Sequence, residues 1–289
     1  MNETVSITQG LSPRRRAYDI TMRTLLYVAA IVICALLVFL IGYILYRGVP
    51  SLSLEFLTSE ESVINDVQGI LPALVNTLYI IIATLIFILP LGVGSAIYLT
   101  EYATNKKLVN IIEFATETLS GMPSIIFALV GVIVFCETLN LGYTLIAGAF
   151  SLVMMTLPTI IRTTQESLKT VPQSYREGSL ALGSGKWHMI RTVVLPSSID
   201  GIVTGCILAI GRIVGESAIL MFTAGMGMRM ANYSELFNTS GATLTVALYV
   251  YAKERADFDQ AFAVAVVLLV IALVINIAAK LAGKKLKKN

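Results

Sequence analysis

Charged and metal-binding side chains are scarce in this chain of 289 residues. Only 13% of the residues are charged while 56% are hydrophobic, a balance that excludes a soluble domain of this length. One histidine, His188, and three cysteines without metal-ligand spacing, Cys34, Cys136 and Cys206, predict neither a metal site nor a disulfide framework. His188 lies in a polar loop, where a surface role is expected. We therefore expect no catalytic site, no metal and no cofactor.

Long apolar runs dominate the chain instead. Runs at about 25–46, 74–99, 119–135, 141–161, 199–223 and 262–281 are each long enough to cross a bilayer. The first exceeds a signal-peptide core and no cleavage pattern follows it, so it is expected to stay as an anchor. We predict an all-α integral membrane protein with six transmembrane helices, organised as a cytoplasmic tail (1–24), helix 25–46, a five-helix domain (71–281) and a basic cytoplasmic tail (282–289).

Glycine and proline interrupt several runs. Pro90 predicts tilt or a kink in the second run, and Gly121 with Pro123 predicts a break or a helix start at the third. Residues 242–251 have apolar positions at helical spacing but are too few to span. We expect an outer or interfacial helix there.

Basic residues divide the loops into two classes. Arg47, Arg229, Lys253 and Arg255 fall on one predicted side and Arg212 within a span, while the remaining lysines and arginines fall on the other side. The positive-inside rule makes that richer side cytoplasmic, together with both termini and the central loop. The segregation of charge by loop also argues against nucleic-acid binding.

The polar segment EGSLALGSGKWHMIRTVVLP, at 177–196, carries the most specific spacing. Glu177, Gly183 and the triplet Val193-x-Leu195-Pro196 resemble the EAA loop (E-A-A-x3-G-x9-I-x-L-P) of ABC importer membrane subunits. Gly178 and Ser179 replace the usual alanines. The resemblance implies a short helix, a turn at the glycine and a second helix, with the first helix docked on an ATPase subunit.

The chemistry of this segment agrees with docking. Small residues permit close approach of a partner, and Gly183 permits a turn with positive φ. The residues expected to couple to the ATPase are Glu177, Gly178, Ser179, Ala181, Leu182 and Gly183. The alternative is an ordinary amphipathic loop helix that ends at a glycine.

The run Gly183-Ser184-Gly185-Lys186 is not a phosphate-binding loop. Leu180 stands where such a loop needs a glycine, and Trp187 replaces the Ser or Thr that would hold Mg²⁺. The remaining chain has no room for a soluble nucleotide-binding domain. ATP hydrolysis, if the chain belongs to an ABC importer, must come from a separate subunit.

Arg212 and Glu216 are ionisable residues within the fifth apolar run. Each would cost roughly 2.5 to 3.5 kcal/mol at mid-membrane, so neither is expected to face lipid. Their i, i+4 spacing predicts a shared helix face, where they partly neutralise each other. Two alternatives remain, a buried ion pair that fixes packing or a charged element that lines an anion path. Arg162, after the fourth run, has similar alternatives, a snorkelling arginine or a path residue.

The small-residue pairs Gly201/Gly205 and Gly211/Gly215 are expected to admit neighbouring helices.

Three segments together resemble the A-type permease of the high-affinity phosphate importer, the PstA family: GMPSIIFALVG at 121–131, LPTIIRTTQESLKTVPQSYREGSLALGSGKWHMIRTVVLP at 157–196 and TGCILAIGRIVGESAILMFTAG at 204–225. The resemblance implies the type I ABC importer (MetI-like) permease fold in a prokaryotic cytoplasmic (inner) membrane. It also implies a heterodimer with a C-type permease, two copies of a cytoplasmic ATPase and an extracytoplasmic phosphate-binding protein. Arg212, Glu216 and Arg162 match residues to which the family gives functional weight.

Other functions remain open. The chain could import a different oxyanion, such as sulfate or molybdate, because selectivity resides largely in the binding protein. A secondary transporter would carry an inverted internal repeat, which the sequence does not display. A membrane-embedded enzyme would need a catalytic constellation, and we find none.

Overall fold

The computed structural model describes residues 13–61, 69–228 and 239–286, and it confirms the all-α prediction. Five helical stretches are long and apolar enough to cross a membrane: Pro13–Ser51, Leu71–Tyr102, Leu145–Thr170, Lys186–Gly215 and Phe258–Lys285. A bent pair of helices supplies a sixth crossing if it is counted as one span. Parts of the tails predicted at 1–24 and 282–289 lie outside the described residues, namely 1–12 and 287–289.

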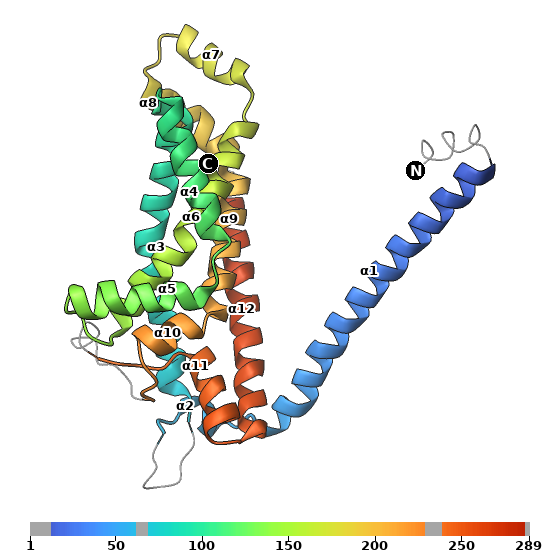
Figure 1. Ribbon diagram of the computed structural model, residues 1–289, viewed down its shortest axis with the longest axis vertical. Helices are drawn as coiled ribbons and strands as arrows, with labels where there is room; N and C mark the ends of the chain where they lie inside the picture. The colour runs from blue at the N-terminus through green and yellow to red at the C-terminus, as the bar shows by residue number, and fades with distance from the viewer. Residues whose placement is uncertain (1–12, 62–68, 229–238, 287–289) are drawn as a thin grey trace.

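Four of these stretches form the bundle, built on α3 (Leu71–Ile97), α6 (Leu145–Thr170), α9 (Leu195–Gly215) and α12 (Phe258–Leu286) (Figure 1). α3 continues through Pro90 without a break and ends in a π-helical segment, η3 (Tyr98–Tyr102). Leu152 and Met155 of α6 are completely buried in the central core. α6 therefore lies at the centre of the bundle.

Glycines allow α9 to approach α6 closely. A Cβ at Gly201 would overlap Ser167, and a Cβ at Gly205 would overlap Thr163. The hydroxyl of Ser167 also donates to the Ser198 carbonyl, at 2.7 Å. The predicted packing role of the Gly201/Gly205 pair is confirmed.

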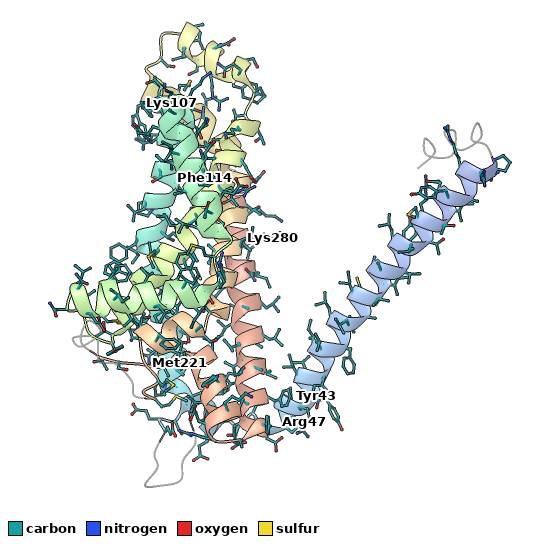
Figure 2. The ribbon with its side chains drawn as sticks, in the orientation of Figure 1. Tyr43, Arg47, Lys107, Phe114, Met221 and Lys280 are labelled. Carbon is teal, nitrogen blue, oxygen red and sulfur yellow. The ribbon has the colours of Figure 1, made fainter. Side chains whose placement is uncertain are left out.

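Helix α1 (Pro13–Gly48) leaves the bundle (Figure 1). It begins well before the predicted start at 25, and none of its most apolar window is buried. Contacts with α12 are confined to the C-terminal end of α1, where Tyr43 and Arg47 lie (Figure 2). The Tyr43 ring packs edge-on against Phe262, with 5.5 Å between centroids, and Arg47 Nη2 lies 3.3 Å from Asp259 Oδ1.

The third apolar run is not a straight span, which corrects the predicted helix at 119–135. Helix α4 (Lys106–Ser120) ends just before Gly121, and α5 (Ser124–Gly131) begins just after Pro123 and continues as the π-helical η4 (Val132–Thr138). The two stretches are bent by 104°. Proline has no N–H to continue the helical ladder and restricts the residue before it, which explains the break at the predicted site.

The end of the bundle opposite α7 (Gln173–Ala181) holds α2 (Leu54–Thr58), η2 (Val49–Ser51) and α11 (Leu244–Tyr249), which continues as η6 (Val250–Glu254). The helix expected at 242–251 is therefore present. It is more buried than a helix lying on an interface, because Leu244, Ala247 and Tyr251 pack in one core cluster with Phe56 of α2. Burial of the hydroxyl, and then the charge of Glu61, raises the pKa of Tyr251 to about 12.

Candidate functional site

The central polar loop folds as the resemblance to the EAA loop implies, with a short helix, a turn and a second helix. Helix α7 ends in a Schellman motif. Gly183 has φ +84°, its N–H donates to the Leu180 carbonyl at 3.0 Å, and the Ser184 N–H donates to the Ser179 carbonyl at 3.3 Å. The Ser184 hydroxyl adds a bond to the same carbonyl at 2.7 Å. Gly183 is thus needed for its backbone conformation.

The predicted coupling residues form an open surface. Five of the six are exposed and Ser179 is half-buried; the exposed ones are Glu177, Gly178, Ala181, Leu182 and Gly183. Leu182 is 90% exposed, and no atom lies within 4 Å of the position that a Cβ on Gly178 would occupy. This surface has the small residues and the uncovered leucine that a docking helix needs.

The second helix of the loop leads directly into the membrane bundle. Helix α8 (Lys186–Met189) continues through the π-helical η5 (Ile190–Val194) into α9. Pro196 lies ten residues after the start of this continuous helix, in the first turn of α9. A proline ring clashes with the carbonyl four residues earlier, and a wider turn directly before Pro196 relieves that clash.

Arg212 and Glu216 do not share a helix face, which corrects the predicted pairing. Helix α9 ends at Gly215, and Glu216 has extended backbone angles, φ −82° and ψ 122°. A separate short helix, α10 (Ala218–Thr223), follows, so the fifth apolar run is two helices and not one. Gly215 sits where α9 stops, and the i, i+4 rule fails because the helix does not continue to the second residue.

The side chain and the backbone carbonyl of Glu216 both form hydrogen bonds at this break between α9 and α10. Its Oε1 accepts from the Ile219 N–H at 3.2 Å, and its backbone carbonyl accepts from the Thr245 hydroxyl at 2.9 Å. One contact caps α10 and the other joins the break to α11. Within the described residues, no basic side chain is paired with Glu216.

Arg212 is half-buried in the last turn of α9, and its side chain makes no ion pair or hydrogen bond with any residue that the structure describes. Gly211 and Gly215 beside it are exposed, and nothing lies within 4 Å of the Cβ positions that they lack. In the part of the chain that the structure describes, no helix packs against the Gly211/Gly215 pair. A cation and an open glycine surface lie together at this end of α9.

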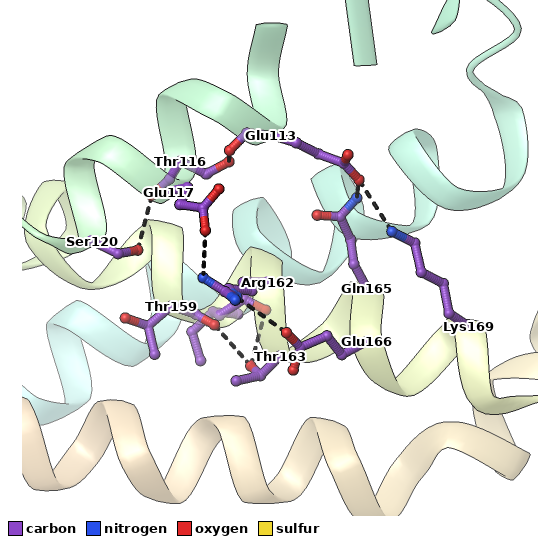
Figure 3. A network of polar contacts seen from close by, with 11 residues as sticks. Glu113, Thr116, Glu117, Ser120, Thr159, Arg162, Thr163, Gln165, Glu166 and Lys169 are labelled. Carbon is purple, nitrogen blue, oxygen red and sulfur yellow. Dashed lines mark hydrogen bonds and ion pairs between the residues drawn. The ribbon is translucent and has the colours of Figure 1, made fainter. Parts of the chain in front are cut away.

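Arg162 lies in a charged network between α4 and α6 (Figure 3). Its Nε donates to Glu166 Oε1 at 3.1 Å, and its Nη1 lies 3.6 Å from Glu117 Oε1. Lys169 and Gln165 both donate to Glu113, at 3.2 and 3.3 Å. These groups surround a cavity of about 190 Å³. Two carboxylates hold Arg162, so it is not an unpaired snorkelling arginine.

Sequence reasoning missed the acidic partners of this network. Glu113 and Glu117 are four residues apart in a segment assigned to a cytoplasmic loop, and they occupy one face of α4. That spacing was visible in the sequence. The partner helix was not, because the pairing depends on how α4 lies along α6.

Known proteins resemble this chain over most of its length. Residues 88–288 match the family model of the binding-protein-dependent transport system inner membrane component. A probable ABC transporter permease of Bacillus subtilis, YqgI, is 37% identical over 273 residues, covering 90% of this chain and 93% of that protein. The phosphate transport system permease protein PstA of Haemophilus influenzae is 30% identical over 92% of this chain and 94% of its own length.

Solved structures support the same fold. A permease chain of a bacterial alginate ABC transporter aligns with a TM-score of 0.67 at 16% identity, over 94% of this chain and 98% of that one. A chain of the MetNI methionine ABC transporter in an inward-facing conformation aligns with a TM-score of 0.58 at 19% identity, over 75% and 94%. The fold is that of the type I ABC importer permeases. This chain belongs to the inner membrane component family of binding-protein-dependent transport systems and is an ABC importer permease related to the PstA proteins.

Proposed function

We propose that this permease is one of two membrane subunits of an ATP-driven importer of inorganic phosphate. Its partners are a C-type permease, two copies of a cytoplasmic ATPase and an extracytoplasmic phosphate-binding protein. The PstA relatives support phosphate as the substrate, since those from Haemophilus influenzae and Mycobacterium tuberculosis are each 30% identical over more than nine tenths of this chain. The protein lies in the cytoplasmic (inner) membrane as a multi-pass subunit.

The observation that carries this proposal is the uncompensated charge of Arg212. An arginine in a membrane helix is costly and requires a counter-charge or water. Within the described residues this chain supplies no partner. A phosphate ion supplies negative charge and several acceptor oxygens, which a planar guanidinium binds with two parallel hydrogen bonds. We place Arg212 in the path, on a surface that the C-type permease completes.

Glu216 has an indirect role in this account. Its carboxylate caps α10 and its backbone holds α11, so it maintains the break that follows Arg212 at the end of α9. An acidic group near the path also limits how tightly an anion is held, because like charges repel. Phosphate can then leave Arg212 during each cycle.

Arg162 is the other arginine of the phosphate path in this proposal. Phosphate has to replace one of its carboxylate partners there. In this conformation its guanidinium is occupied by Glu117 and Glu166. Both contacts are solvent-exposed, and exposed ion pairs contribute little free energy. Phosphate can therefore replace a carboxylate at Arg162 as it passes between α4 and α6.

The coupling surface on α7 accounts for the use of ATP. Closure of the ATPase dimer moves the docked α7, and the bundle opens to the loaded binding protein; hydrolysis restores the inward-facing state. The end of α12 and the start of α1 both point toward the α7 end of the molecule (Figure 1). That arrangement is consistent with cytoplasmic termini on the same side as the ATPase.

Uptake measurements test the substrate. Cells that lack their own high-affinity phosphate importer receive this chain with its three partner subunits, and uptake of radiolabelled phosphate is measured with excess sulfate or molybdate as competitor. We expect ATP-dependent phosphate uptake that neither competitor reduces. Uptake of sulfate or molybdate without phosphate uptake would assign the chain to another oxyanion importer. Uptake that persists without the ATPase would contradict the ABC mechanism.

A further inference from the structure

Arg176, one residue before the coupling glutamate Glu177, lies on the inner side of α7. Its Nε and Nη2 both donate to Glu101 Oε1, at 3.0 and 2.9 Å. Its Nη1 donates to the Val171 carbonyl at 2.6 Å, and its Nη2 donates to the Leu168 carbonyl at 2.9 Å. Glu101 belongs to η3 at the end of α3, whereas Leu168 and Val171 lie at the end of α6. One guanidinium thus joins α7 to two membrane helices.

This contact differs from the other ion pairs in its burial. The Arg176 and Glu101 side chains are only 12% and 6% exposed. Each other ion pair within the described residues has at least one partner that is 35% exposed or more. Exposed pairs are screened by solvent and contribute little, while loss of one partner from a buried pair leaves an uncompensated charge. Separation of Arg176 from Glu101 is therefore costly, because it would leave a buried charge without its partner.

The remainder of α7 has few anchors of its own. No residue of α7 is buried, and Figure 1 shows the helix at the far end of the molecule with a loop on each side. A cavity of about 490 Å³ lies beneath it, lined by Gln173, Arg176 and Leu180 of α7 and by Glu101 of η3, among others. Arg176 crosses the gap between α7 and the bundle.

The bundle side of the contact is rigid. Leu168 and Val171 are buried in a cluster with Ala96, Ile97, Met189 and Ile190. This cluster packs the ends of α3 and α6 against α8 and η5. A force applied to Arg176 therefore acts on packed helix ends, since a close-packed core transmits strain.

We propose that Arg176 and Glu101 are a positioning pair that passes movement of α7 to α3 and α6. This inference rests on the proposed docking of α7 to an ATPase. Arg176 does not touch the substrate; it keeps the coupling helix in register with the two membrane helices while the ATPase closes. Without the pair, α7 stays docked but moves independently of the bundle, and ATP is hydrolysed without matching transport.

The first measurement is the number of phosphate ions transported per ATP hydrolysed, in proteoliposomes that contain the complete transporter and its binding protein. We compare the native chain with Glu101→Gln and Arg176→Lys. The lysine variant retains a positive charge but lacks the fork that reaches Glu101 and two carbonyls together. We expect ATPase pull-down at the native level, sustained hydrolysis and a ratio at least fivefold lower in both variants.

The matched control is Asp19→Asn on α1. It breaks the exposed ion pair with Arg23, whose side chain is 57% exposed, and leaves α7 unaltered. We expect the native ratio in this variant. An unchanged ratio in both Glu101→Gln and Arg176→Lys, whether or not their rates fall, would overturn the proposal. An equal fall in the control would also overturn it.

A second measurement does not depend on phosphate. Spin labels at cysteines that replace Tyr98 of η3 and Tyr175 of α7, in a chain without native cysteines, report the distance between the two segments within the ATPase complex. We expect a narrow distance distribution that stays narrow on ATP binding, and a broad one in Arg176→Lys. An equally narrow distribution in that variant contradicts the positioning role even if the native complex transports no phosphate. A narrow native distribution without phosphate uptake would instead refute the proposed substrate alone.

Discussion

The Glu216 carboxylate accepts a hydrogen bond from the Ile219 N–H, at 3.2 Å, and is not paired with Arg212 four residues earlier. The separation of these two charges changes the chemistry expected of the fifth apolar run. A neutralised pair would suit helix packing. A capped break beside an unpaired arginine suits a surface that meets an anion.

Replacement of Glu216 tests the capping role. Glu216→Ala removes the acceptor for the Ile219 N–H and is expected to cost about 1 kcal/mol of stability, the usual net contribution of one hydrogen bond. Glu216→Gln keeps an acceptor and should cost less. Thermal unfolding of the purified complex in detergent measures both.

The same assay tests the absence of an Arg212–Glu216 ion pair. The stability effects of Arg212→Gln and Glu216→Gln should add to within about 0.5 kcal/mol in the double variant. A coupling energy of about 1 kcal/mol or more between the two substitutions would show that Arg212 and Glu216 interact directly.

Substitution at Gly201 tests the contact between α6 and α9. Gly201→Ala places a methyl group against Ser167, and forced overpacking of this kind costs about 1 to 3 kcal/mol. The matched control is Gly94→Ala inside α3, where nothing lies within 4 Å of the added atom. Alanine there should be neutral or stabilising by up to about 1 kcal/mol, because glycine is unfavourable within a helix. Equal destabilisation by both substitutions would contradict the packing assigned to α9.

Substitution of Gly183 tests the turn between α7 and α8. Its φ of +84° is costly for any residue with a Cβ, by about 1 to 2 kcal/mol. We expect Gly183→Val to abolish or sharply reduce recovery of the ATPase in a pull-down with the membrane subunits. The control is Gly185→Val, two residues on, because Gly185 has φ −72° and open space around it. Unchanged ATPase recovery with Gly183→Val would contradict the proposed docking of α7 on the ATPase.

Substitutions of Arg162 and of its two carboxylate partners distinguish a role in the phosphate path from a role in holding α4 to α6. If Arg162 meets phosphate, Arg162→Gln lowers uptake at least tenfold while the complex assembles normally. Glu117→Gln and Glu166→Gln remove the same exposed contacts but should alter stability by less than about 1 kcal/mol and retain uptake. A similar loss of assembly in all three variants would show that the network only holds α4 to α6.

The sequence was sufficient for those features that depend on local spacing. The apolar runs predicted the membrane class. The motif from Glu177 to Pro196 carried the resemblance that implied the helix, turn and second helix, and Gly121 with Pro123 predicted a break or a helix start at the third run. Each depends on the conformations available to a few consecutive residues.

The features that the sequence did not reveal depend on where a helix ends or what packs beside it. Arg212 and Glu216 were assigned to one face because the apolar pattern continues past Gly215, and hydropathy carries no signal for a break inside an apolar run. The contact between Arg176 and Glu101 joins residues that are 75 positions apart, and no local sequence pattern predicts it.

Phosphate uptake by the Arg212→Gln variant, in the complete transporter, tests the central claim most directly. The matched control is Arg23→Gln, the same chemical change in an exposed ion pair on α1. We predict that Arg212→Gln abolishes or sharply reduces ATP-dependent uptake while the complex assembles, and that Arg23→Gln transports at the native rate. Native uptake with Arg212→Gln would contradict the account and remove this arginine from the translocation path.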